Sequence, residues 1–178
     1  MKIGYALCGS FCTHAKSIAV LESLVETYTV VPILSENAAH TDTRFGKAAD
    51  LVQILTTLCG RAPICTIADA EPLGPAEALD LLVITPCTGN TLAKLAHGIT
   101  DTAVTMAAKA QLRSDRPLLL ALATNDALSA NLGNIATMRS RKHVHFVPLA
   151  MDDPVKKPHS LVADFSSIPG EIEKLLQE

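Results

Sequence analysis

Five short apolar runs, rich in Val, Ile and Leu, are spaced along the chain and separated by longer segments of mixed polarity. The runs cover residues 3–8, 29–34, 81–85, 118–123 and 144–149. Runs of this length, bounded by Gly, Pro or polar turn residues, are typical of strands that are covered on both faces. The pattern therefore predicts the strands of a parallel sheet.

Helical patterns lie between these runs. They cover residues 13–27, 44–59, 90–97, 102–114, 127–141 and 168–177. The alternation of strand and helix with short connections indicates right-handed crossovers, hence an α/β fold. We expect a three-layer α/β/α sandwich with a mostly parallel, Rossmann-like (flavodoxin-like) sheet. No repeat, low-complexity stretch or linker divides the chain, so residues 1–178 are predicted to form a single domain.

Composition narrows the functional classes. The chain has 178 residues, of which 48% are hydrophobic and 19% charged, which indicates a folded protein. Fifteen basic and eighteen acidic residues give a net charge of −3, and aromatic residues make up 3%. Neither the charge nor the aromatic content favours binding to nucleic acid or to an anionic membrane. Since no run approaches the ~20 apolar residues of a membrane span and no signal peptide is evident, a cytoplasmic location is expected.

The five cysteines are odd in number and show no paired metal-ligand spacing. They indicate a reduced protein without a metal site, whose thiols act mostly as small apolar side chains.

The segment after the first apolar run contains Gly9 and Ser10, just before a predicted helix. Ligands of parallel sheets bind beyond the carboxyl ends of the strands, and a helix N-terminus there favours a phosphate. Only one glycine is present, so the G-x-G-x-x-G pattern of dinucleotide sites is missing and a mononucleotide phosphate fits better than NAD. An ordinary turn with a capped helix explains the same segment equally well.

The third apolar run leads into the densest polar segment. Four consecutive small polar residues, more than one helix cap needs, stand there: Thr88, Gly89, Asn90 and Thr91. Further small polar residues follow the second and fourth runs: Ser35, Thr124 and Asn125.

Cations stand in two further loops. Lys156 and Lys157 lie between two prolines, which predicts a fixed loop that presents positive charge to an acidic substrate. Arg44 has the geometry to hold a carboxylate through two hydrogen bonds. Solvated charged residues are the competing explanation for all three.

Residues 86–101 fit the pattern Pro-x-[Ser/Thr]-x-Asn-Thr-x-Ala-Lys-x-Ala-x-Gly-x-x-Asp. With Gly9, Ser10 and Ser35, this segment makes the chain resemble the FMN-binding flavoprotein superfamily of cysteine decarboxylases and flavin prenyltransferases. The resemblance implies that Gly9 and Ser10 hold the phosphate of FMN. It also implies homo-oligomers, trimers or multiples of them, with flavin near a subunit interface. The residues expected around the flavin are Ser35, Thr88, Gly89, Asn90, Thr91, Thr124 and Asn125.

Residues 37–46, 70–75, 124–128 and 152–158 resemble one branch of that superfamily, flavoproteins of sporulation. This resemblance implies a separate NAD(P)-binding partner, the A subunit, with which the chain forms a small pyridine dicarboxylate in the mother cell. It leaves the catalytic residues unknown. The residues that it implies for binding the dicarboxylate substrate are Arg44, Glu71, Lys156 and Lys157.

Two other functions stay open. The first is a stand-alone FMN-dependent decarboxylase or flavin prenyltransferase. Against it, the decarboxylase motif Pro-x-Met-Asn survives only as Asn125, and Val155 replaces an aromatic residue of the prenyltransferases. The second is a non-catalytic activating subunit with a vestigial flavin pocket.

Overall fold

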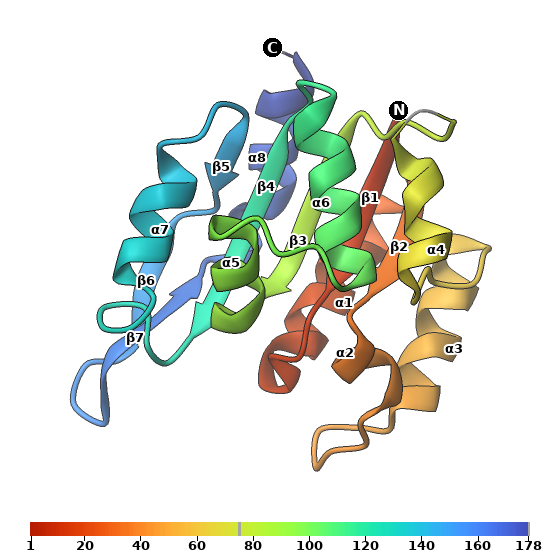
Figure 1. Ribbon diagram of the computed structural model, residues 1–178. Coiled ribbons are helices and arrows are strands. Elements are labelled where there is room, and N and C mark those ends of the chain that lie inside the picture. The colour runs from red at the N-terminus through yellow and green to blue at the C-terminus, as the bar shows by residue number, and fades with distance from the viewer. Residues whose placement is uncertain (75, 178) are drawn as a thin grey trace.

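A computed structural model describes residues 1–74 and 76–177 (Figure 1). Its strands form one sheet in the order β2-β1-β3-β4-β7-β6, and β5 pairs with β4 beside that path. Strands β1 to β5 pair in parallel, whereas β7 is antiparallel to both β4 and β6. The mostly parallel sheet is therefore confirmed. The strands are β1 (Lys2–Leu7), β2 (Thr29–Leu34), β3 (Leu81–Cys87), β4 (Leu118–Thr124), β5 (Val144–Phe146), β6 (Leu149–Asp153) and β7 (Lys157–Ala163).

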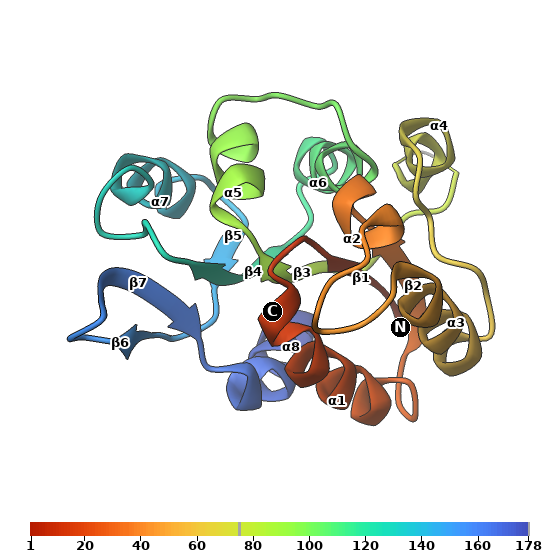
Figure 2. The same ribbon diagram turned by 90° about the horizontal axis from the view of Figure 1, so that it is seen from below.

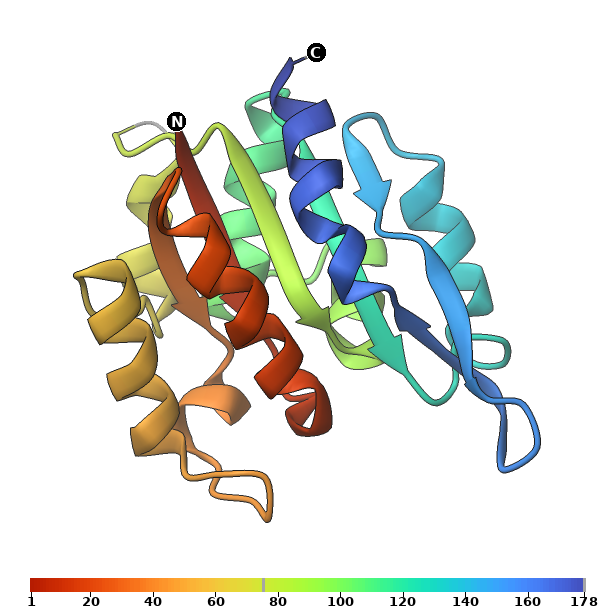
Figure 3. The same cartoon turned by 180° about the vertical axis from the view of Figure 1, so that it is seen from behind.

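Helices cover both faces of this sheet, which confirms the three-layer sandwich (Figure 2). Helices α1, α3 and α8 lie over one face (Figure 3), and α4 to α7 lie over the other (Figure 1). Three short 3-10 segments complete the elements: η1 (Phe11–Thr13), η2 (Glu71–Leu73) and η3 (Phe165–Ser167). The helices are α1 (His14–Leu24), α2 (Glu36–His40), α3 (Ala48–Cys59), α4 (Ile67–Ala70), α5 (Gly89–Ala96), α6 (Ala103–Arg113), α7 (Leu132–Arg139) and α8 (Ile168–Gln177).

The central strands explain why the chain folds into layers. Every residue of β3 is buried, and successive side chains point to opposite faces of a strand. Leu82 and Ile84 accordingly join the core under α4 to α7, whereas Leu81 and Val83 join the core under α1, α3 and α8. Each fully buried aliphatic side chain contributes about 1.5–3 kcal/mol, so continuous apolar runs favour a sheet covered on both sides.

The chain changes face between β1 and β3. From β1 it enters α1 on one face, and from β3 it enters α5 on the opposite face (Figure 2). Because these two strands are neighbours in the sheet, their carboxyl ends border a crevice of the kind in which parallel sheets bind ligands.

Several predicted boundaries were wrong, and the first is the start of the helix expected from residue 44. Helix α3 begins at Ala48. Gly46 has φ 151°, in the region that favours glycine, and the carboxylate of Asp42 accepts from the main-chain N–H of Ala48 at 2.9 Å. Residues before Ala48 therefore form a turn, and Arg44 lies in it.

The second wrong boundary is the start of the helix expected over residues 127–141. The carbonyl of Asp126 accepts from the N–H groups of Ser129 and Asn131, which holds this segment in turns, and α7 begins only at Leu132. The short helices α2 and α4 were not predicted, since a four- or five-residue segment carries too little periodicity.

The third concerns the loop expected around Lys156 and Lys157. Residues 149–163 form an antiparallel hairpin of β6 and β7, so only its tip is a turn. There the carboxylate of Asp153 accepts from the N–H groups of Val155 and Lys156, an Asx turn that reverses the chain. The hairpin also shortens the strand expected over residues 144–149 to β5.

Within residues 1–74 and 76–177, no helix is long and apolar enough to cross a membrane. The five cysteines are unpaired thiols, and the described residues contain no group of three or more His, Cys, Asp or Glu placed to hold a metal.

Candidate functional site

Two adjoining cavities lie at the carboxyl ends of the parallel strands. One, here called the cradle cavity, has about 460 Å³, and the other, the wall cavity, about 490 Å³. Both fall within the roughly 300–1,000 Å³ typical of small-molecule sites. Gly9, Thr88 and Asn90 line both cavities, so the two meet at the ends of β1 and β3.

All nine residues expected to bind the cofactor line these cavities. Ser35 and Thr91 line the cradle cavity. Ser10 and Gly89 line the wall cavity, as do Thr124 and Asn125 at the end of β4. Residues from four separate strand ends therefore converge on one region. We call Gly9, Ser10, Ser35 and residues 88–91 the cradle, and we call Thr124 and Asn125 the wall.

The loop after β1 forms the first side of the cradle. The Ser10 side chain makes no capping hydrogen bond, which leaves its hydroxyl available to a ligand. A Cβ built on Gly9 would meet its nearest neighbours at 3.6 Å, an ordinary contact, and the φ of Gly9 is not positive. Neither packing nor backbone geometry requires glycine here, so what the missing side chain provides is free space in both cavities.

His14 holds the loop after β1 in place through a hydrogen bond. Its Nε2 donates to the carbonyl of Cys8 at 2.7 Å, and burial lowers its pKa. The imidazole is therefore neutral and acts as a fixed donor rather than as a charge.

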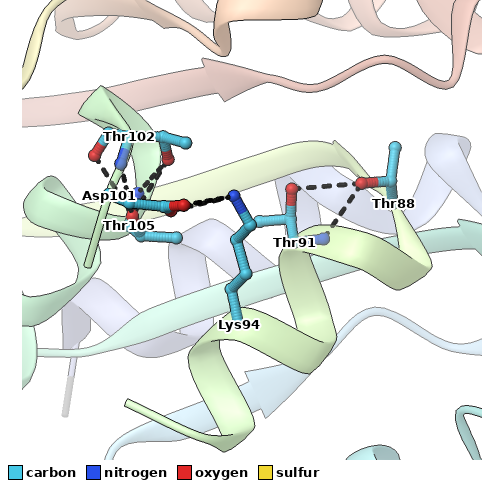
Figure 4. A network of polar contacts seen from close by, with 6 residues as sticks. All are labelled: Thr88, Thr91, Lys94, Asp101, Thr102 and Thr105. Atoms are coloured by element: carbon cyan, nitrogen blue, oxygen red, sulfur yellow. Dashed lines mark hydrogen bonds and ion pairs between the residues drawn. The ribbon is translucent and has the colours of Figure 1, made fainter. Parts of the chain in front are cut away.

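The start of α5 forms the opposite side of the cradle. The Thr88 hydroxyl accepts from the main-chain N–H of Thr91 at 3.2 Å and donates to its hydroxyl at 3.0 Å (Figure 4). The first-turn N–H groups of a helix have no carbonyl partner within the helix, so those of Gly89 and Asn90 are left for a ligand. The helix dipole adds a partial positive charge at the same place, and together these features suit an anion.

One ion pair stands beside the cradle. Lys94 lines the cradle cavity, and its ammonium group contacts both carboxylate oxygens of Asp101, at 2.9 and 2.7 Å (Figure 4). The next helix begins with a reciprocal cap between Thr102 and Thr105. This part of the motif therefore fixes the segment between α5 and α6, and Asp101 offsets the charge of Lys94.

Buried thiols lie behind the cradle. The Thr91 hydroxyl donates to Cys8 Sγ at 3.3 Å, and burial raises the pKa of Cys8 to about 11. Burial also raises the pKa of Cys87 well above its usual value. Both thiols stay protonated near neutral pH, so they pack in the core and are not nucleophiles.

The wall is held by a compact polar network. Thr124 Oγ1 donates to the Asp126 carboxylate at 2.5 Å, and Asn131 donates to the same oxygen at 2.9 Å. The Thr124 hydrogen bond, followed by the one from Asn131, lowers the pKa of Asp126, so this carboxylate is ionised. A Cβ on Gly89 would lie 2.5 Å from both Thr124 Oγ1 and Asn131 Nδ2. The bare α-carbon of Gly89 therefore lets the cradle and the wall pack against each other.

The β6–β7 hairpin closes the wall cavity. The buried hydroxyl of Ser160 donates to Asn125 Oδ1 at 3.3 Å. Lys157 and Asp152 both line the cavity and form an ion pair, in which Asp152 raises the pKa of Lys157. The hairpin thus contributes a cation and an anion together.

The other residues expected to bind substrate lie elsewhere. Arg44 stacks on the ring of its neighbour Phe45, 4.8 Å from the centroid, in the exposed turn before α3. Glu71 begins η2, which packs against α6, and Lys156 is exposed at the tip of the hairpin. Among the described residues no ion pair joins Arg44 to Glu71, and neither cavity is lined by either residue or by Lys156. Their role in substrate binding stays a prediction.

Several lining residues were not predicted. They include Asn37 and Asp152, together with Thr102. Asp126 and Ser160 were missed as well, because their effect on the wall depends on contacts that the pattern does not show. An Asp after an apolar run followed by Asn five residues later was the available signal for the Asp126 network.

Comparison with known proteins shows the family of this chain. Residues 1–172 match the family described as Flavoprotein, and the chain belongs to that family. The chain is 45% identical over 176 residues to the B subunit of dipicolinate synthase from Bacillus subtilis (strain 168), covering 98% of this chain and 88% of that protein.

Solved structures give the same result. The crystal structure of the dipicolinate synthase B subunit from Bacillus halodurans C matches with a TM-score of 0.90 and 37% identity, over 99% of this chain and 91% of that one. A dodecameric FMN-dependent UbiX-like decarboxylase from Escherichia coli O157:H7 matches with a TM-score of 0.65 and 25% identity, over 83% of this chain and 80% of that one.

Proposed function

We propose that this chain is the flavin-binding B subunit of a dipicolinate synthase. It binds FMN at the cradle and the wall and works with a separate NAD(P)-binding A subunit to form dipicolinate, a pyridine dicarboxylate, from a dihydrodipicolinate-pathway intermediate. The observation that carries the proposal is the convergence of all nine expected cofactor residues on two adjoining cavities. The near full-length similarity to a dipicolinate synthase B subunit supports the particular reaction.

The chemistry of the cavities fits FMN. The cradle offers hydroxyls from Ser10 and Ser35 and the first-turn N–H groups of α5, which Thr88 caps, and these are donors for a phosphate. Lys94 stands beside them in an ion pair with Asp101. The space left at Gly9 allows an anion to approach the main chain closely. The wall cavity then continues from the cradle with room for the rest of a mononucleotide.

FMN, when bound, supplies the capacity to accept or donate hydride or electrons. The chain's own residues bind and orient it: the cradle fixes one end and the wall the other. Lys157, charged and at the rim of the wall cavity, is placed to attract a dicarboxylate, whereas Asp152 limits how strongly it does so. We assign no proton transfer to a side chain, because the thiols behind the cradle are protonated and His14 is committed to a main-chain carbonyl.

Assembly is part of the proposal. We infer a homo-oligomer, a trimer or a multiple of it, that associates with the A subunit in the mother-cell cytoplasm during sporulation. The dodecameric assembly of one FMN-dependent structural relative supports the first point. In such an assembly Arg44 and Glu71, which lie away from the cavities of their own protomer, are candidates for completing a neighbour's site.

The test is FMN binding followed by turnover. The purified chain should bind FMN, seen as a shifted flavin absorption spectrum that survives removal of free flavin. The Asn90→Leu variant should lose it, because a bulky side chain would fill the junction of the two cavities. When the A subunit, NAD(P) and the dihydrodipicolinate-pathway intermediate are added, the loaded chain should then form dipicolinate.

The outcomes separate the alternatives. Flavin turnover by the chain alone would favour a stand-alone decarboxylase or prenyltransferase. Full dipicolinate formation by the A subunit with a chain that binds no FMN would contradict the proposal and favour an activating subunit with a vestigial pocket.

A further inference from the structure

The wall contains two side chains whose hydrogen-bonding roles are already decided by residues behind them. The carboxylate of Asp126 is ionised and has no proton to give, so in their 2.5 Å hydrogen bond the Thr124 hydroxyl must be the donor. The single O–H of Thr124 is therefore already used in this hydrogen bond. Toward the wall cavity it therefore presents only lone pairs.

Asn125, in contrast, presents a hydrogen-bond donor to the cavity. Its Oδ1 accepts from the Ser160 hydroxyl at 3.3 Å, and Ser160 is 1% exposed. This contact orients the amide, and its NH₂, which can only donate, has no hydrogen-bond partner among the described residues and is available to a ligand. Adjacent residues of one strand end thus present an acceptor and a donor side by side.

We propose that Asp126 and Ser160 set the polarity of the wall, so that Thr124 and Asn125 recognise a neutral group with an N–H next to a carbonyl oxygen. This inference rests on the proposed flavin site and deepens it. An ionised phosphate or carboxylate has no proton to donate to Thr124 and would lie near the charge of Asp126, so this pair of side chains favours the neutral group. The cradle, which offers donors, takes the phosphate instead.

Oxidised flavin has one such group. Its ring N3 carries the only N–H of the isoalloxazine, and a carbonyl flanks it on each side. The wall is therefore assigned to the N3 edge of the ring, with N3–H donating to Thr124 and a neighbouring carbonyl accepting from Asn125. Asp126 and Ser160 are positioning residues, because they act through Thr124 and Asn125.

The test compares two ligands, FMN and FMN methylated at N3, in fluorescence titrations of the purified chain. Wild-type protein should bind the methylated ligand about tenfold more weakly, the usual effect of one lost hydrogen bond. Thr124→Val should weaken FMN binding by about the same factor and bring the two ligands to nearly equal affinity. A purely steric effect of the methyl group would persist in Thr124→Val.

Further variants separate positioning from folding. Thr124→Ser keeps the hydroxyl and should keep the preference for FMN, and Thr137→Val, on the exposed side of α7, should change nothing. Asp126→Ala should weaken FMN binding several-fold, yet the double variant Asp126→Ala/Thr124→Val should bind no more weakly than Thr124→Val alone. Asp126→Asn retains an acceptor oxygen and should bind FMN nearly as wild type does.

Two results would overturn the assignment in distinguishable ways. If wild-type protein binds no FMN, the proposed function fails and this inference fails with it. If wild-type protein binds FMN but folded Thr124→Val shows the same affinity and the same preference over the methylated ligand, only the polarity of the wall is refuted.

Discussion

The cradle and the wall face each other across one pair of cavities, yet they are built differently. The cradle uses helix starts and short hydroxyl side chains, such as the Thr88 cap of α5. Its available groups are mostly donors. The wall uses side chains fixed by other side chains: Thr124 is bound by Asp126, two residues away, and Asn125 by Ser160, which is distant in the chain.

This difference indicates how one ligand is held at two ends. A surface of donors at a helix N-terminus suits an anion. A surface with one fixed acceptor and one fixed donor suits a neutral polar edge. The two ends are joined by Gly89, whose missing side chain lets them touch.

Breaking that joint should have the largest effect. In Gly89→Ala, the added Cβ would overlap Thr124 Oγ1 and Asn131 Nδ2, so either the wall or α5 must move. We expect a loss of about 1–3 kcal/mol in the free energy of unfolding and weak FMN binding, measured by denaturant unfolding and by titration. Gly133→Ala is the control, because a Cβ at this α7 position meets open space and should slightly stabilise the helix. Unchanged stability and binding in Gly89→Ala would contradict the joint.

The cradle alone is tested by removing its cap. Thr88→Ala should cost about 1 kcal/mol of stability and weaken FMN binding by roughly tenfold or more, because the hydroxyl caps α5 and so holds its first-turn N–H groups at the cavities. Thr66→Ala removes an equivalent cap from α4, which lines neither cavity. It should lose similar stability and no FMN affinity. Equal loss of FMN affinity in both variants would show that Thr88 matters only through folding.

A smaller effect is expected at the rim of the wall cavity. Lys157→Gln should weaken binding of dipicolinate to the FMN-loaded chain, by less than about fivefold because the ion pair is exposed and shared with Asp152. Lys156→Gln, at the hairpin tip outside both cavities, should leave it unchanged. Calorimetric titration measures both. A larger loss in Lys156→Gln would place the dicarboxylate on the other side of the hairpin.

The smallest effect is a pH dependence of the wall. The folded-state pKa of Asp126 lies below its usual value, so its contribution to stability is present above the ordinary carboxyl range and is lost as pH falls through the folded pKa. Because the carboxylate is only partly buried, we expect only about a few tenths of a kcal/mol. Wild-type and Asp126→Ala proteins should differ in unfolding free energy at neutral pH and converge in acid. A difference that grows toward acid pH would contradict the sign.

The same contrast explains what the sequence could and could not predict. The cradle is local: caps, a glycine and hydroxyls stand within a few residues of each strand end, where turn chemistry is readable. The layers were predictable for a similar reason, since β3 and β4 are continuous apolar runs. The wall depends on pairs far apart in the chain, such as Ser160 with Asn125, and no periodicity records them.

The hairpin shows the other limit of the sequence. Its strands alternate weakly and are mostly exposed, so Lys157 was expected in a loop, whereas pairing with β4 places it at the rim of the wall cavity. Arg44 was expected at a helix start but lies in a turn, because the chain there is shaped by Gly46 and by the Asp42 cap.

The most direct test of the two-ended site is the ratio of FMN to riboflavin affinity, since these ligands differ only by the phosphate. Wild-type protein should prefer FMN by at least about tenfold, because the phosphate receives charge-assisted hydrogen bonds in the cradle. Thr88→Ala should reduce this ratio, whereas Thr124→Val should weaken both ligands equally and leave the ratio unchanged. A ratio near one in wild-type protein, or a ratio that changes in Thr124→Val and not in Thr88→Ala, would contradict the assignment of the phosphate to the cradle.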